Sequence, residues 1–410
     1  LTEAESGSDL LSVQTQATLD EATGTWLVTG AKRFITNGCG DVLLVLARSE
    51  DPNKFGGGRG LSLFLVEKSE AVEVRKVEHK LGLHGSPTCE LYFENAPALL
   101  IGQRGKGLTR YVNSLVNSAR IAVAAQALGV SEAAFQYARR YADERAQFGK
   151  KIKEFPAVAQ LLANMKIGIE AARSLLYLTS QAVDMEFALA EKLKDMSESD
   201  PAFKETKKQK AEYAKLAEVL TPIAKYHTAE LSIRVASDAI QVYGGYGYMK
   251  EYPVERLFRD ARITSIYEGT SQIQVDAALL KILKGNLEIL WKRYNRQQYQ
   301  DEELAARLAE VAEAQNQLTE AIAFVKTKQI DGRSDTDYRL LSARALVDMA
   351  IDVLVGYLFL DQAPKSSHKR LLARKFVNDM RLRTEASAKS IHQGDRTVVE
   401  NLEALVYGEH

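Results

Sequence analysis

The hydrophobic repeat changes once along this 410-residue chain, and that change limits the folds that it can adopt. From Leu1 to about Ala98, short runs rich in β-branched and aromatic residues alternate with Gly, Asn and Asp turns, as strands do. From about Gly105, apolar residues recur at spacings of three and four, which is typical of helices. The pattern predicts an α+β protein with a barrel-like or sandwich-like β domain at 1–100, a helical bundle at 101–285 and an additional all-α region at 286–410.

Composition narrows the class of partner. Lys plus Arg equals Asp plus Glu at 54 each, so no net field draws the chain to nucleic acid or an anionic membrane. A small molecule or another protein is the expected partner. Cys39 and Cys89 lack metal-ligand spacing, and we interpret both as small buried hydrophobic residues, with no metal site. No apolar run approaches the ~20 residues that span a bilayer, so we expect no transmembrane segment. Because the chain opens on Leu1, we expect residues upstream.

The segment at 240–274 combines a glycine cluster with an isolated acid. Gly244 and Gly245 favour positive φ or close approach to a ligand, although such glycines also form ordinary helix caps. Glu268 follows Ile266 and Tyr267, which are able to desolvate its carboxylate. Burial raises a carboxyl pKa toward neutrality and suits a general base. An exposed loop glutamate is the equal alternative.

Two further segments carry groups suited to a ligand. Thr2, Ser8 and Thr36 offer short hydroxyls, and Phe34 offers an aromatic wall for a flat heterocycle, although strand and turn preferences or core packing also explain them. Between two predicted long helices, Arg145 offers a planar fork for phosphate groups. An ordinary salt bridge is the alternative for Arg145.

Several motifs in one order resemble the acyl-CoA dehydrogenase family. They are LTEAESGSD, FITNG, NSARIAVAAQALG, DERAQFGKKI, QVYGGYGYMKEYPVERLFRDARI and IYEGTSQIQ, which together span residues 1 to about 285. The resemblance implies a middle β domain and a C-terminal four-helix-bundle domain, with FAD between them and a neighbouring subunit. The family's N-terminal helical domain is absent from this chain. The insertion at 193–210 and the helices after 285 are similar to those of larger members.

The family's site residues map onto this sequence one by one. Glu268 would be the base, since Ser118, Ala119 and Arg120 offer no acid on the facing helix. The flavin ring would meet Thr2, Phe34, Ile35 and Thr36. The FAD diphosphate and adenosine would meet Arg145, Gln147, Phe148, Gln241, Gly244 and Gly245 of a partner subunit, together with Thr270 and Gln272. The acyl-CoA substrate would meet Ser8, Arg120, Tyr267 and Gly269.

The implied reaction is FAD-dependent α,β-dehydrogenation of an acyl-CoA thioester to the 2-enoyl-CoA, as in fatty acid β-oxidation. Electrons would pass to an electron-transfer flavoprotein, and the protein would be a homodimer or homotetramer of the bacterial cytoplasm or the mitochondrial matrix. One alternative is an acyl-CoA oxidase that uses oxygen. The other is a non-catalytic FAD-binding relative associated with nucleic acid or acting as a scaffold, which would lack the base or carry a basic patch.

Overall fold

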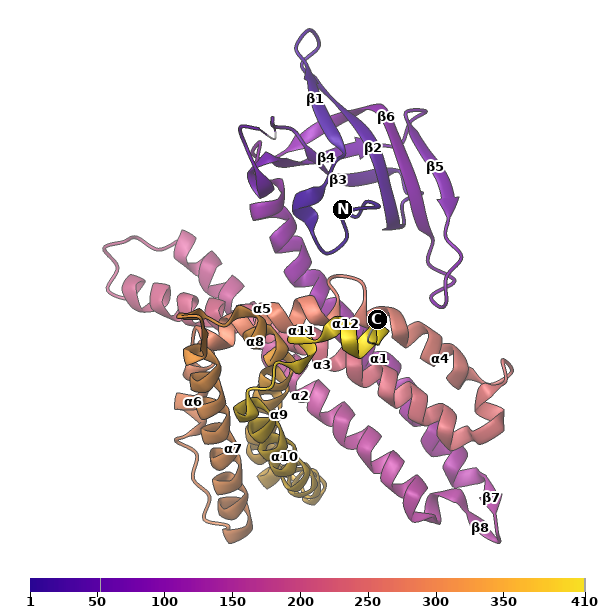
Figure 1. The fold of residues 1–410 in the computed structure, drawn as a ribbon, viewed down its shortest axis with the longest axis vertical. Helices are drawn as coiled ribbons and strands as arrows, with labels where there is room; N and C mark the ends of the chain where they lie inside the picture. Colours follow the sequence, from indigo (N-terminus) through magenta and orange to yellow (C-terminus); the bar gives the residue numbers. More distant parts are fainter. Residues whose placement is uncertain (52, 409–410) are drawn as a thin grey trace. The chain divides into compact units, whose positions relative to one another are not determined.

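The computed structural model describes residues 1–51 and 53–408 (Figure 1). These residues form two compact units, which are joined in the chain between Arg120 and Ile121 and are treated separately below. The first unit holds the β-sheet and the second is mainly helical, so the predicted α+β class is confirmed. The domain boundaries predicted after residues 100 and 285 stay predictions.

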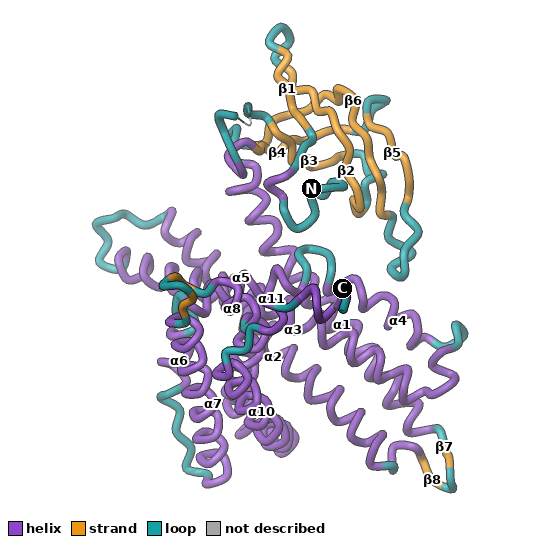
Figure 2. The backbone as a smooth tube through the Cα atoms, viewed as in Figure 1, coloured by secondary structure: helices purple, strands orange, loops and turns teal. Residues whose placement is uncertain are grey.

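The sheet of the first unit closes on itself. Its strands are β1 (Gln16–Asp20), β2 (Thr25–Thr36), β3 (Val42–Arg48), β4 (Leu61–Glu67), β5 (Val72–Val77) and β6 (Thr88–Ile101), in the order β2-β1-β3-β4-β6-β5. Strand β2 also pairs with β6, which joins the two sides of the sheet (Figure 2). Alternate residues such as Trp26 and Val28 point into the core, as a barrel requires. The short helix η1 (Leu10–Ser12) precedes β1, and η2 (Gly57–Gly60) lies between β3 and β4 in the chain.

A buried ion pair fixes the N-terminal motif to this barrel. Lys32 Nζ lies 2.6 Å from Glu3 Oε1, and both side chains are less than a tenth exposed. Glu3 also accepts hydrogen bonds from the main-chain N–H groups of Gln14 and Thr15, and Lys32 donates to the Leu46 carbonyl at 2.8 Å. Because each charge has several partners, the pair avoids the penalty of an isolated buried charge. Glu3 therefore has a structural role in the motif.

The second unit is built from long antiparallel helices (Figure 1). The first unit ends with η3 (Gly107–Val112) and the start of α1 (Asn113–Glu144). The rest of α1 belongs to the second unit and leads through the hairpin β7 (Ala146–Gln147) and β8 (Lys150–Lys151) and η4 (Ile152–Glu154) to α2 (Pro156–Lys194). The bundle continues with α3 (Phe203–Tyr243), η5 (Gly244–Tyr248), α4 (Pro253–Arg262), η6 (Ile263–Ser265) and α5 (Ser271–Leu283). The remaining elements are α6 (Glu288–Tyr294), α7 (Glu302–Thr327), β9 (Gln329–Ile330), β10 (Arg333–Ser334), α8 (Thr336–Leu341), α9 (Ala343–Gln362), η7 (Ala363–Lys365), α10 (Ser367–Gln393), α11 (Thr397–Glu400) and α12 (Leu402–Tyr407).

The polar segment at 197–210 is only partly a loop. The sequence predicts a polar, solvated segment at 197–210 and a helix from about Thr206, and the structure begins that helix, α3, at Phe203, with Thr206 buried. Its Lys and Glu residues form the exposed side of an ordinary amphipathic helix. The same helix continues through Pro222 to Tyr243.

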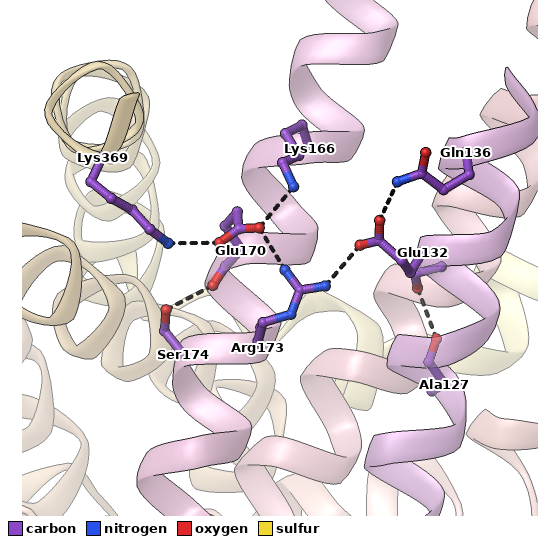
Figure 3. A network of polar contacts seen from close by, with 9 residues as sticks. Ala127, Glu132, Gln136, Lys166, Glu170, Arg173, Ser174 and Lys369 are labelled. Carbon is purple, nitrogen blue, oxygen red and sulfur yellow. Dashed lines mark hydrogen bonds and ion pairs between the residues drawn. The ribbon is translucent and has the colours of Figure 1, made fainter. Parts of the chain in front are cut away.

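The helices after residue 285 share one hydrophobic core with the bundle. Helix α9 packs against α2, α3 and α5, and its buried face belongs to the same cluster of apolar side chains. A polar network reinforces this packing: Glu170 on α2 accepts hydrogen bonds from Lys166 and Arg173 of its own helix and from Lys369 on α10 (Figure 3). Arg173 also reaches Glu132 on α1 at 2.7 Å. The network thus connects α1, α2 and α10.

The two cysteines differ in exposure. Cys89 is buried on β6, as expected, whereas Cys39 is exposed in the turn after β2, so the prediction that it is a buried hydrophobic residue is wrong. The preceding residue, Gly38, packs against Cys89 in its place, because a Cβ on residue 38 would lie only 2.9 Å from the Cys89 Cβ. Among the helices of the described residues, none combines the length and apolar character needed to cross a membrane.

Candidate functional site

Glu268 lies in the loop that connects η6 to α5, in an unusual backbone conformation. Its φ is 53° and that of Gly269 is 90°, and both values lie in the left-handed region that residues other than glycine rarely adopt. A Cβ on residue 269 would lie 2.5 Å from Gln274 Nε2, so only glycine fits there. The side chain of Glu268 is exposed. The carboxylate of Glu268 is therefore accessible to a ligand.

Two buried side chains contact the backbone of this loop, and sequence reasoning missed both. Lys225 on α3 donates from Nζ to the Gly269 carbonyl at 2.6 Å. Gln274 on α5 donates from Nε2 to the Glu268 carbonyl at 3.0 Å. Both side chains are 0% exposed. A lysine in the middle of a helix gives no sequence signal for such a contact, because only the tertiary fold brings residue 225 to residue 269.

The residues just before Glu268 do not bury its carboxylate. Ile266 is itself exposed, and Tyr267 is half-buried and donates its hydroxyl proton to Gln126 Oε1 on α1. Burial, together with the nearby Glu268 carboxylate, raises the pKa of Tyr267 above its usual range. The expectation that Ile266 and Tyr267 desolvate Glu268 is therefore not met by the chain itself.

Thr270 and Gln272 begin the helix that follows Glu268. Thr270 is the N-cap of α5 and accepts a hydrogen bond from the Ile273 N–H at 3.3 Å. Gln272 donates to Asp276 at 2.9 Å on the exposed side of the same helix. The cap explains why the loop ends at residue 270. Their predicted contacts with the ADP part of a cofactor stay predictions.

A second set of predicted residues surrounds a pocket of about 450 Å³. Arg145 and Gln147 come from the turn after α1, and Gly244 and Gly245 come from the end of α3. Gly244 has φ 61° and ψ −138°, a combination that favours glycine, and no heavy atom lies within 4 Å of a Cβ built on either glycine. The pocket therefore offers a guanidinium, an amide and open space beside main chain.

Aromatic rings form much of the remaining wall. Tyr141 on α1 stacks on Tyr243 of α3 with ring centroids 4.1 Å apart, and the Arg145 guanidinium lies 5.6 Å from the ring centroid of Tyr246. Burial raises the pKa of Tyr141 and of Tyr243, so both hydroxyls remain protonated at neutral pH. Sequence reasoning missed these rings, although tyrosines beside the Gly-Gly pair were a visible signal.

Phe148 and Gln241 lie near this pocket in the chain but do not line it. Phe148 occupies the tip of the β7–β8 hairpin with φ 52°, and its side chain is 93% exposed. Gln241 is exposed in the last turn of α3, and its carbonyl accepts the N–H of Gly244. The predicted contacts of Phe148 and Gln241 with FAD stay predictions.

In the β unit, a bulge exposes the predicted aromatic residue. The register between β2 and β6 shifts between Lys32 and Ile35, and Phe34 adopts φ 58° there with 60% of its surface exposed. The bulge thus turns Phe34 outward, which excludes the core-packing alternative. Thr36 is exposed two residues later, and Ile35 is half-buried between them.

The other predicted residues of this unit lie on its N-terminal segment and on α1. The Thr2 carbonyl accepts the N–H of Arg33 at 2.9 Å, so the segment runs beside the bulged part of β2. Ser8 is exposed, and Arg120 is half-buried on α1. Within residues 1–51 and 53–408, no group of three or more His, Cys, Asp or Glu side chains is arranged to hold a metal ion.

Comparisons with known proteins agree with this division of the chain. Residues 1–96 match the model of the acyl-CoA dehydrogenase middle domain, and residues 121–272 match that of the acyl-CoA dehydrogenase C-terminal domain. An acyl-CoA dehydrogenase of Bacillus subtilis (strain 168) is 41% identical over 279 residues, which are 67% of this chain and 65% of the relative. The chain thus spans about two thirds of the length of such curated relatives.

Solved structures extend the likeness to the whole chain. The butyryl-CoA dehydrogenase of Megasphaera elsdenii is 34% identical with a TM-score of 0.57, and the match covers 69% of this chain and 67% of that one. An acyl-CoA dehydrogenase of Bacillus anthracis, solved with FAD, is 26% identical with a TM-score of 0.79, and the match covers 100% of this chain and 72% of that one. The added helices after residue 285 therefore occur in another solved member.

Fold and site together define a protein with a closed β unit and a helical unit, and the helical unit carries both an exposed glutamate in the loop before α5 and a pocket lined by arginine and tyrosine. With the two matching domains and the relatives above, the chain belongs to the acyl-CoA dehydrogenase family.

Proposed function

We propose that this chain carries the flavin-binding and proton-abstracting parts of an acyl-CoA dehydrogenase, which converts an acyl-CoA thioester to its 2-enoyl-CoA. The observation that carries the proposal is the exposed Glu268 carboxylate on a left-handed residue, whose loop accepts hydrogen bonds from the buried side chains of Lys225 and Gln274. Non-glycine residues keep such a conformation only where the surroundings impose it, and those places are often functional.

The residues of the helical unit suit FAD. Arg145 offers a positive fork for the diphosphate, and the open space beside Gly244 and Gly245 permits close approach of a ligand to the main chain. Stacked tyrosines offer a wall for a flat ring. In the β unit, the exposed Phe34 ring and the Thr36 hydroxyl suit the flavin ring itself. Thr2, Ile35, Gln147, Phe148, Gln241, Thr270 and Gln272 complete the proposed FAD contacts.

The proposed chemistry divides two hydrogens between two acceptors. Glu268 takes the proton from the carbon next to the thioester carbonyl, and its protonated carboxyl group then holds that proton. FAD, when bound, supplies the acceptor for the hydride that leaves the β carbon, so that a double bond forms between the two carbons. Substrate binding excludes water from the exposed carboxylate and makes it a stronger base. Ser8, Arg120, Tyr267 and Gly269 are the proposed substrate contacts.

Partners and location follow as further proposals. The reduced cofactor would be reoxidised by an electron-transfer flavoprotein, and the protein would work as a homodimer or homotetramer in the bacterial cytoplasm or the mitochondrial matrix. Phe148, almost wholly exposed at the hairpin tip, is the residue with which we test a contact between subunits.

The test is anaerobic titration of the FAD-loaded full-length protein with acyl-CoAs of increasing chain length. We expect bleaching of the oxidised flavin absorption, and a Glu268→Gln variant should slow it by about 10²- to 10⁴-fold, as loss of a general base does. Glu198→Gln, on an exposed loop, is the matched control and should bleach at the wild-type rate.

Each other result has a definite meaning. No FAD binding, or no bleaching with any chain length, would favour the non-catalytic relative. Bleaching that Glu268→Gln leaves unchanged would remove Glu268 from the base role. Reoxidation of the reduced protein by oxygen as fast as turnover would favour an oxidase over a dehydrogenase.

A further inference from the structure

The main chain around Glu268 is attached to its surroundings at several points. At one end of the loop, Thr264 and Ser232 of α3 share a hydrogen bond of 3.2 Å between their hydroxyls. At the other end, the Ser271 hydroxyl donates to Glu230 of α3 at 2.5 Å. Between these anchors lie the two residues with positive φ, Glu268 and Gly269. Helix α3 therefore contacts both ends of the loop through side-chain hydrogen bonds.

Lys225 and Gln274 act on the strained residues themselves. The hydrogen bond from Lys225 to the Gly269 carbonyl is short at 2.6 Å and charge-assisted, in a site where the lysine is 0% exposed. Gln274 binds the preceding carbonyl of Glu268 at 3.0 Å and reaches that of Gly269 at 3.4 Å. Two consecutive carbonyls are thus fixed from two helices, and neither peptide plane can rotate without breaking one of these bonds.

We propose that Lys225 and Gln274 are positioning residues for Glu268: their hydrogen bonds to the carbonyls of residues 268 and 269 keep the backbone left-handed and so aim the carboxylate at the substrate. This inference rests on the proposed function, in which Glu268 removes the α proton. Loss of either bond would free the peptide planes that follow residues 268 and 269, so that the loop could relax and shift Glu268 as a whole. A misplacement of about 1 Å lowers a reaction rate by about 10²-fold.

The test compares Lys225→Met with Lys281→Met. Methionine keeps the length of the buried side chain but donates no hydrogen bond to Gly269. Lys281 on α5 pairs with Glu218 on α3 at 2.6 Å, away from the loop, so it controls for loss of a lysine at the same helix pair. We expect faster hydrogen exchange at the amides of residues 263–274 in Lys225→Met, measured on the full-length protein without substrate by mass spectrometry.

Activity provides the second readout. In the FAD-loaded Lys225→Met variant, flavin reduction by a reactive acyl-CoA should slow by about 10²-fold, while flavin content and the acyl-CoA concentration for half-saturation stay at the wild-type values. Lys281→Met should match wild type in both readouts. A general loss of packing would instead lower flavin content and raise exchange throughout α3.

The proposal has clear points of failure. Unchanged exchange at 263–274, or faster exchange with an unchanged rate of reduction, would overturn it. If Lys225→Met does not fold, Gln274→Leu decides in its place, because it removes the bond to the Glu268 carbonyl and leaves Lys225 in position. A wild-type rate in Glu268→Gln would refute the proposed function, whereas the exchange measurement would still report whether the two side chains hold the loop.

Discussion

Strained residues coincide with the predicted site. Among the described residues, positive φ at a non-glycine, non-Asn and non-Asp position occurs at Phe34, Leu83, Phe148 and Glu268. Phe34, Phe148 and Glu268 were chosen from the sequence for other reasons, as an aromatic wall, a contact of the FAD diphosphate and adenosine, and a base. Bulky side chains pay more for the left-handed region than Asn or Asp do. Three of these four positions belong to the predicted site, whose assignment stays a prediction.

The two glycines of the pocket make separable predictions. Gly244→Ala should lower the free energy of unfolding by about 1–2 kcal/mol, because φ 61° is unfavourable for a residue with a Cβ although no atom lies close enough to clash. Gly245→Ala should leave stability within ~0.5 kcal/mol of wild type but weaken FAD retention, because its Cβ would enter the space proposed for the cofactor. Urea unfolding and flavin release measure the two effects.

The stability loss in Gly244→Ala and the weaker FAD retention in Gly245→Ala are each judged against the other variant. Equal destabilisation by Gly244→Ala and Gly245→Ala would mean that the turn, and not the single left-handed residue, sets the cost. Full FAD retention in Gly245→Ala would move the cofactor away from this glycine pair.

At the scale of single elements, the change of hydrophobic period predicted the sheet and the long helices well, because burial on one face leaves a direct trace in the sequence. Sequence reasoning placed the start of α3 at about Thr206, whereas the helix begins at Phe203, because the polar residues before Thr206 resemble a solvated loop. Contacts between distant elements leave no such trace. Lys225 with Gly269, and the bulge that turns Phe34 outward, required the structure.

The network between α2 and α10 predicts how stability depends on pH. Burial alone would raise the pKa of Glu170, but hydrogen bonds and charges from Lys166 and Lys369 outweigh it and lower the pKa to about 2. The folded-state pKa thus lies below the ordinary value of 4.5, so the stabilisation is complete above pH 4.5 and is lost as the pH falls toward 2. Glu170→Gln should lower the free energy of unfolding by about 1.5–3 kcal/mol at pH 7.

Urea unfolding of both proteins between pH 7 and pH 3 measures this effect, and the difference between them should shrink as the pH falls. Glu191→Gln is the control, because Glu191 pairs with Lys194 where both side chains are about half exposed or more, and such pairs contribute little. A difference between wild type and Glu170→Gln that stays constant with pH would contradict a role for the charge of Glu170.

At the scale of the molecule, the helices after residue 285 are part of the helical unit and not an appendage. They share its core, and the Bacillus anthracis structure matches them along with the rest of the chain. The sequence predicted their helical character from Leu304, Leu308, Val311 and similar positions. It gave no sign that α9 would pack against α2, α3 and α5, because an apolar helix face does not name its partner.

Assembly is the remaining property at this scale, and Phe148 makes it testable. Its ring is 93% exposed and lies at 6.2 Å, centroid to centroid, from that of Phe155 in an edge-to-face arrangement, so it buries little surface within its own chain. If a second copy covers it, Phe148→Ser should weaken self-association by at least about 10-fold, because burying a phenylalanine contributes about 1.5–3 kcal/mol. Sedimentation analysis over a range of concentrations measures this, and thermal unfolding should be unchanged at concentrations where both proteins are monomeric.

Phe187→Ser on α2, where the side chain is 68% exposed, is the matched control and should leave association unchanged. Equal weakening by both variants would indicate general surface stickiness, and no weakening by Phe148→Ser would place the subunit contact elsewhere.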